Sequence, residues 1–128
     1  MAITIDMVGM VVKDMAAALR FYRLLGLPIP EGKDGEDYVD VITPNGYRVS
    51  FNTVKLARMV DPDWVEPVGA RIGLAFKCDS PTEVDATYQR LVDHGYHGHR
   101  APWDAFWGQR YAQVDDPAGN HVDIFAAL

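Results

Sequence analysis

The sequence has 128 residues, the size of one compact domain. Hydrophobic residues make up 48% of it, which is enough for a folded core and too many for a disordered chain. The formal net charge is -6, and no run of lysine or arginine occurs. This balance argues against nucleic acid or an anionic membrane surface as a partner.

Cysteine usage and hydropathy indicate a cytoplasmic protein. Cys78 is the only cysteine, so an intramolecular disulfide is excluded. Residues 1–6 contain no basic region followed by an apolar stretch, so we expect no signal peptide. No apolar run approaches the roughly 20 residues that a membrane-spanning helix needs, and we expect no membrane partner.

The first half of the chain predicts a strand, a helix and a hairpin. Asp14 is a suitable N-cap, and Gly26 followed by Pro28 ends the helix. Apolar residues alternate in the strands and recur at helical spacing between them. The predicted segments are a strand at 3–12, a helix at 15–25, a polar loop at 31–37, a strand at 38–42, a turn at 43–46 and a strand at 47–53.

The second half repeats this order. Ser80 and Glu83 form a capping box with Pro81 at the first helical position, and Gly95 ends the helix. The predicted segments are a strand at 71–78, this helix, a loop at 96–107, a strand at 109–114, a turn at 116–119 and a strand at 120–125.

The two halves also match residue by residue. Residues 8–10 correspond to 72–74, and residues 44–51 correspond to 117–124. A match of this length indicates a duplicated supersecondary unit, because a solenoid needs at least three copies.

With these segments the sequence resembles the vicinal oxygen chelate superfamily, which includes glyoxalase I, extradiol dioxygenases, fosfomycin-resistance enzymes and bleomycin-resistance proteins. Residues 7–15, 21–27 and 115–123 carry the resemblance. It implies an α+β fold of two tandem βαβββ modules that form a cupped mixed sheet with helices on the outer face. It also implies one domain over 1–128, with module one at about 1–53, a connector at about 54–68 and module two at about 69–128.

Metal-dependent members of that superfamily hold their ion at four symmetric positions, and this sequence departs from the pattern. The resemblance places those positions at Met7, Ser50, Arg71 and Asp123. Methionine is a soft ligand, serine a weak neutral donor and arginine a permanent cation, so only Asp123 suits a hard or borderline ion. We therefore expect no metal centre and no cofactor, as in the drug-binding bleomycin-resistance type.

The remaining histidines do not change this expectation. His94 lies in the last predicted helical turn, where partial positive charge is favourable. His97 and His99 follow in the loop. Their spacing is compatible with a metal site, but we interpret them as solvated loop residues.

Strand parity separates two faces. One face is aliphatic and suits packing against the helices. The other mixes aromatic, polar and charged groups, which favours a wet cavity because unpaired buried polar groups are costly. The candidate ligand contacts on this face are Met7, Tyr38, Asp40, Arg48, Ser50, Asn52, Arg71, Tyr111, His121 and Asp123. For Arg48, Arg71, Asp40 and Asp123, mutual ion pairing is an equal alternative to ligand binding.

Aromatic residues outside the predicted strands extend the candidate site. Trp64 lies in the connector, and Trp103, Phe106 and Trp107 lie in the predicted 96–107 loop. Exposed tryptophans are typical of interfaces or ligand contacts, so each suits a dimer contact or a stacking wall for a large flat molecule.

Two functions follow as hypotheses. The first is a metal-independent binding protein that sequesters a bulky aromatic or conjugated natural product, as in antibiotic self-resistance, without chemistry. The alternative is a lyase, isomerase or epimerase acting on a small carbonyl compound, with Asp123 or Asp40 as base, His121 as a second acid or base and Arg71 or Arg48 stabilising an oxyanion. The resemblance also implies a homodimer whose ligand sites are shared between chains.

Overall fold

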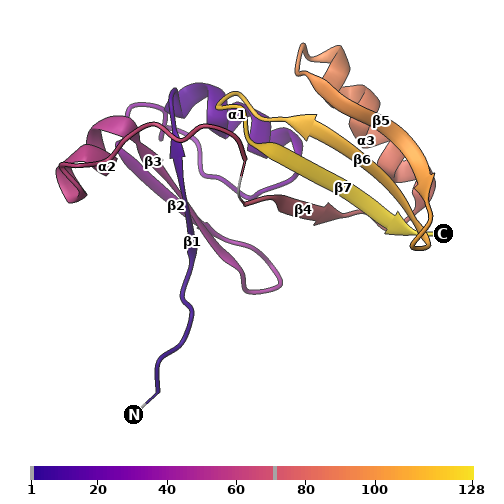
Figure 1. Cartoon of the computed structure of the whole chain (residues 1–128), viewed down its shortest axis with the longest axis horizontal. Coiled ribbons are helices and arrows are strands. Elements are labelled where there is room, and N and C mark those ends of the chain that lie inside the picture. The colour runs from indigo at the N-terminus through magenta and orange to yellow at the C-terminus, as the bar shows by residue number, and fades with distance from the viewer. Residues whose placement is uncertain (1, 71) are drawn as a thin grey trace. The chain divides into compact units, whose positions relative to one another are not determined.

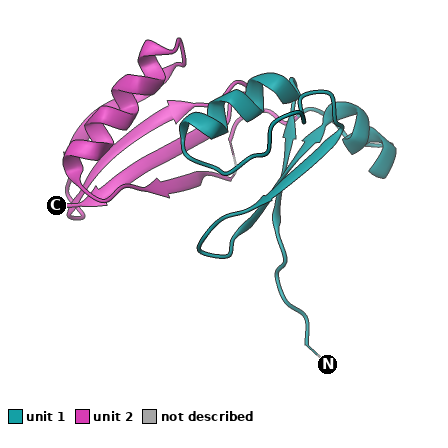
Figure 2. Cartoon of the chain, turned by 180° about the vertical axis from the view of Figure 1, so that it is seen from behind, with its two compact units in different colours: residues 1–66 teal, residues 67–128 magenta. Residues whose placement is uncertain are grey.

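The computed structural model describes residues 2–70 and 72–128, and the described chain divides into two compact units, Met1–Glu66 and Pro67–Leu128 (Figures 1 and 2). The first unit contains β1 (Val8–Val12), α1 (Met15–Leu24), β2 (Tyr38–Ile42), β3 (Arg48–Thr53) and α2 (Val54–Val60). The second contains β4 (Leu74–Lys77), α3 (Pro81–Asp93), β5 (Gly98–Ala105), β6 (Gln109–Asp115) and β7 (His121–Ala127). The α+β fold class predicted from the sequence is confirmed.

The first unit is a sheet in the order β1-β3-β2 with α1 connecting β1 to β2 (Figure 1). β1 runs parallel to β3, and β2 runs antiparallel to β3. The N-cap side chain of Asp14 accepts a hydrogen bond from the backbone N–H of Ala17 at 3.1 Å, and α1 then turns its apolar stripe inward. The rings of Tyr22 and Phe51, both fully buried, lie 5.2 Å apart and join this helix to β3.

The second unit is a sheet in the order β4-β7-β6-β5, with α3 packed on β5, β6 and β7. β4 is parallel to β7, whereas β7, β6 and β5 are successively antiparallel. Alternate residues of β6 and β7 face the helix and are completely buried, as strand parity predicts. These residues are Ala112, Val114, Val122 and Ile124.

The turn between β6 and β7 is held by Asp116. This carboxylate is 5% exposed and accepts hydrogen bonds from the backbone N–H groups of Ala118 and Asn120, at 2.9 and 2.8 Å. Gly119 has φ 87°, a conformation that glycine adopts without the steric cost of a Cβ. This turn fixes which residues of β6 and β7 lie opposite each other.

Several predicted segments differ from the observed ones. The first strand begins at Val8 rather than residue 3, and β4 covers only 74–77 of the predicted 71–78. The predicted 96–107 loop is wrong over Gly98–Ala105, because these residues form β5. The connector contains α2, which the sequence did not predict. Residues 28–37, all described, contain no strand.

The match between the halves is also shifted. In the sequence match, Val49 corresponds to Val122. In the structure, Val49 pairs with Val8 of β1, and Val122 pairs with Leu74 of β4. The sequence match paired Val8 with Ile72, two residues earlier. Because side chains alternate with period two, this shift keeps every residue on its predicted face.

The central position of Phe51 makes the first core testable. We expect Phe51→Ala to lower the free energy of unfolding by about 3–5 kcal/mol, because it leaves a cavity beside Tyr22. Tyr47→Ala removes an aromatic ring that is 69% exposed in the same unit and should change stability by at most about 0.5 kcal/mol. Urea unfolding followed by circular dichroism measures both, and equal effects of the two substitutions would contradict this packing.

Candidate functional site

In the first unit, the predicted ligand contacts gather on the sheet face opposite α1. Tyr38, Asp40 and Ile42 of β2 lie opposite Asn52, Ser50 and Arg48 of β3 in the antiparallel register. This pairing brings the predicted residues Tyr38, Asp40, Arg48, Ser50 and Asn52 into one group.

Arg48 is the centre of an ion-pair network on this face. Its Nε and Nη2 donate to the Asp40 carboxylate at 2.8 and 2.6 Å, and its Nη1 donates to Asp6 at 2.6 Å. The hydrogen bond to Asp40 raises the pKa of Arg48 further above its ordinary value. Arg48 and Asp40 therefore form the ion pair that the sequence analysis gave as the alternative to ligand binding. Asp6 is a further partner, which the alternation of residues along the strands did not identify.

The positions that the superfamily uses for metal ligands do not suit a divalent ion here. Met7 Sδ accepts a hydrogen bond from the Tyr38 hydroxyl at 3.6 Å. Ser50 is 1% exposed, and its Oγ accepts from Asn52 at 3.1 Å. Neither group is a suitable donor to a hard or borderline cation. Arg71 lies outside the described residues.

Asp123, in the second unit, has a satisfied carboxylate. One oxygen accepts the Tyr111 hydroxyl at 2.6 Å, and the other accepts the Gln113 side-chain N–H at 3.0 Å. Burial, together with the hydrogen bond and the charge of Asp123, raises the pKa of Tyr111 to about 12. Tyr111 is thus held as a neutral phenol that donates to a carboxylate, a short charge-assisted bond.

An aromatic cluster surrounds Tyr111 on the same sheet. Trp103 lies opposite Tyr111 in the β5–β6 register, and Phe125 lies opposite it in the β6–β7 register. The Tyr111 ring centroid is 5.5 Å from that of Trp103, 5.2 Å from Trp107 and 6.1 Å from Phe125. We call these four residues and Phe106, whose ring is 5.0 Å from Trp107, the aromatic cluster.

The aromatic cluster is open at one end. Phe106 is 97% exposed and Trp107 is 48% exposed, although the Trp107 indole N–H donates to Gln109 at 2.8 Å. The guanidinium of Arg100 lies 3.5 Å from the centroid of the Trp103 ring, a cation–π contact. Sequence reasoning missed Arg100, because it assigned this segment to a loop and could not place the residue beside Trp103.

Two predicted contacts lie apart from these groups. Trp64 is in the first unit, where Arg58 stacks on its ring at 5.7 Å. His121, at the start of β7, binds Asp115 through Nδ1 at 2.5 Å. Asp115 and the neighbouring His97 and His99 were not among the predicted site residues, although the His-x-His spacing was a signal for them.

Comparison with known proteins identifies the family. The Glyoxalase/Bleomycin resistance protein/Dioxygenase superfamily profile matches residues 4–124. The chain belongs to this superfamily. An uncharacterized protein from Mycobacterium bovis is 30% identical over 122 residues, covering 90% of this chain and 78% of that relative. The related uncharacterized protein of Mycobacterium tuberculosis is also 30% identical, over 90% of this chain and 69% of its own.

Solved structures of the superfamily have the same fold. A glyoxalase/bleomycin resistance protein/dioxygenase from Nocardioides is 27% identical, with a TM-score of 0.77 over 100% of this chain and 85% of that one. A glyoxalase/bleomycin resistance protein/dioxygenase family enzyme from Burkholderia phytofirmans has a TM-score of 0.84 at 21% identity, over 96% of this chain and 98% of that one. None of the described helices is both long and apolar enough to cross a membrane.

The Tyr111–Asp123 bond predicts a late tyrosine titration. Of the six tyrosines, Tyr111 should ionise only near pH 12, because burial and then Asp123 disfavour the phenolate. The pKa is raised, so the stabilisation of the neutral phenol is present below its ordinary pKa of about 10 and is lost as the pH rises through about 12. Phenolate absorbance after rapid pH jumps measures this transition.

Two substitutions assign that transition. Tyr111→Phe should remove it. Asp123→Asn should lower the Tyr111 pKa only part of the way towards 10, because the burial remains. A Tyr111 pKa near its ordinary value of 10.0 would contradict the hydrogen-bonded geometry.

Proposed function

We propose that this protein binds and sequesters a bulky, planar aromatic or conjugated natural product, without metal and without chemistry. The observation that carries the proposal is the aromatic cluster on the face of β5, β6 and β7 that is turned away from α3. Exposure of tryptophan and phenylalanine rings to water is energetically unfavourable, and exposed groups of such rings are typical of ligand contacts.

Polar groups beside the aromatic cluster suit orientation of such a ligand. Gln113 and Asp123 lie opposite each other on the same face as Tyr111, and Arg100 lies over Trp103. A few placed polar groups in a mostly aromatic surface are typical of small-molecule sites. Each edge-to-face or stacked contact between two aromatic rings contributes about 0.5–1.5 kcal/mol in addition to the free energy of burying the apolar surface. Several rings together therefore support tight binding.

The donor chemistry supports binding rather than metal-assisted catalysis at the superfamily position. Among the described residues there, Met7 and Ser50 are poor ligands, and the Asp123 carboxylate already accepts two hydrogen bonds. Displacing Tyr111 and Gln113 from Asp123 would leave two polar groups to be satisfied elsewhere, which opposes use of this carboxylate as a ligand.

One observation favours the alternative, an isomerase or lyase acting on a small carbonyl compound. His121 and Asp115 form a 2.5 Å imidazole–carboxylate pair, the arrangement that orients a general base. The pair is at the far end of the β6–β7 face from Tyr111, next to the turn. Turnover of methylglyoxal and glutathione by the purified protein would support this alternative and contradict a purely binding role.

The binding proposal is tested by titration with a panel of planar aromatic antibiotics while tryptophan fluorescence is followed. At least one should bind with a Kd in the micromolar range or tighter, about -8 kcal/mol or more favourable. Trp103→Ala should weaken that ligand about tenfold, or about 1.4 kcal/mol, in calorimetry. Tyr47→Ala, which removes an exposed aromatic ring from the first unit, should leave binding unchanged.

If no compound of the panel bound at micromolar concentrations, the result would count against sequestration of an aromatic ligand. Equal weakening by Trp103→Ala and Tyr47→Ala would show that any binding is not at the aromatic cluster.

We also propose that the protein is a cytoplasmic homodimer whose chains share their ligand sites, as the superfamily resemblance implies. The exposed Phe106 and Trp107 support this, because each is suited to a contact between copies. Sedimentation equilibrium should give twice the 14.3 kDa chain mass, and Phe106→Glu should shift the equilibrium towards monomer. A monomer at high concentration would contradict the assembly.

A further inference from the structure

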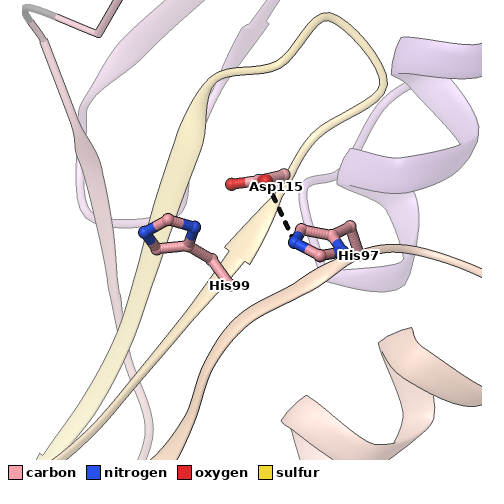
Figure 3. Close-up of side chains that lie close together, drawn as sticks. All are labelled: His97, His99 and Asp115. Carbon is pink, nitrogen blue, oxygen red and sulfur yellow. Dashed lines mark ion pairs between the residues drawn. The ribbon is translucent and has the colours of Figure 1, made fainter.

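We propose that His97, His99 and Asp115 form a binding site for a divalent transition-metal ion of the zinc class, away from the superfamily position. One ligand atom from each of the three side chains lies within 4.8 Å of the others (Figure 3). Two imidazoles and a carboxylate are a typical zinc ligand set. This inference does not depend on the proposed function.

Strand pairing holds the three side chains together. The backbone N–H of Asp115 donates to the carbonyl of His97 at 2.9 Å, where β5 begins beside the end of β6. The β5–β6 register shifts by one residue between Gly98 and Arg100, so His99 is the extra residue of a bulge. Bulges re-aim side chains, and Figure 3 shows the His97 and His99 rings on either side of the Asp115 carboxylate.

The Asp115 carboxylate is oriented for this role by His121. Asp115 and His121 are direct partners in the β6–β7 register, and Asp115 Oδ1 is bonded to His121 Nδ1. The other oxygen, Oδ2, is 3.9 Å from His97 Nε2. The His121 ring also lies 4.3 Å from that of His99, tilted by 33°. A hydrogen bond from outside the ligand set that fixes a ligating carboxylate is a regular feature of protein metal sites.

Small side-chain rotations complete the geometry. Ligand atoms around a tetrahedral zinc ion with bonds of about 2.0–2.1 Å are roughly 3.3 Å apart, closer than in the structure. His97, with 73% of its side chain exposed, has the freedom to close this gap, while Asp115, with 21% exposed, stays fixed. Three protein ligands leave one coordination position for water or for an external donor.

The ion would lie on the same face as the aromatic cluster but at its other end. Asp115 and Tyr111 are four residues apart on β6, which is about 13 Å along a strand. Gln113 and Asp123 form the row between them. The proposed ligands therefore share no residue with the hydrogen bonds that hold Tyr111.

Calorimetric titration of the untagged, chelator-treated protein with zinc chloride tests the site. We expect one ion per chain, with affinity at least tenfold weaker in His97→Ala and in His99→Ala. His94→Ala is the matched control, because His94 bonds the Arg90 carbonyl at the end of α3 and is not in the cluster. Circular dichroism should show that all three variants, at exposed positions, stay folded. X-ray absorption should show two imidazoles among nitrogen and oxygen ligands.

Three results would overturn the proposal. The first is no zinc binding by the unaltered protein. The second is equal weakening by His94→Ala and His97→Ala, which would indicate diffuse surface association. The third is zinc binding that survives His97→Ala and His99→Ala but is lost in Asp123→Asn, which would place the ion at the superfamily position.

Discussion

The antiparallel register of β6 with β7 is the constraint on which the second unit and its candidate sites depend. It pairs Tyr111 with Phe125, Gln113 with Asp123 and Asp115 with His121 on one face. The residues between them, such as Val114 and Ile124, are fully buried on the face that α3 covers. A slip of one residue would bury the carboxylates and expose the valines, so burial of one face fixes the chemistry of the other. Asp116 holds the turn that sets this register.

That face carries three kinds of chemistry in order along the strands. Aromatic rings gather around Tyr111, a hydrogen-bonded amide and carboxylate lie in the middle, and a histidine–carboxylate group lies at the end next to the turn. On the corresponding face of the first unit, the charge of Arg48 is paired with the carboxylates of Asp40 and Asp6. The protein thus keeps the superfamily fold. Three of the four positions that the resemblance assigns to metal ligands, Met7, Ser50 and Asp123, are engaged in other hydrogen bonds in the described structure.

Sequence reasoning recovered the fold class and the two faces because periodicity reports burial directly. Residues 38–42 form the predicted strand, and the capping box at Ser80 begins α3. It missed α2 because this helix has only 7 residues, too few for a helical period to stand out in the connector. It missed β5 because register shifts between Gly98 and Arg100 and between Arg100 and Trp103 break the period of two. The hydrogen bond between Arg48 and Asp6 joins residues far apart in the sequence, and so does the grouping of His99 with Asp115. Both depend on tertiary contacts that no local sequence pattern encodes.

The central claim is that the exposed face of β5, β6 and β7 is a ligand-binding surface organised around Tyr111. Its most direct test is a two-dimensional NMR titration of the nitrogen-15-labelled protein with a planar aromatic ligand. The account predicts that the indole signals of Trp103 and Trp107 and the backbone amides of β6 shift together and saturate at a single Kd. Saturating shifts confined to residues of α3 or α1, with both indoles unchanged, would contradict it.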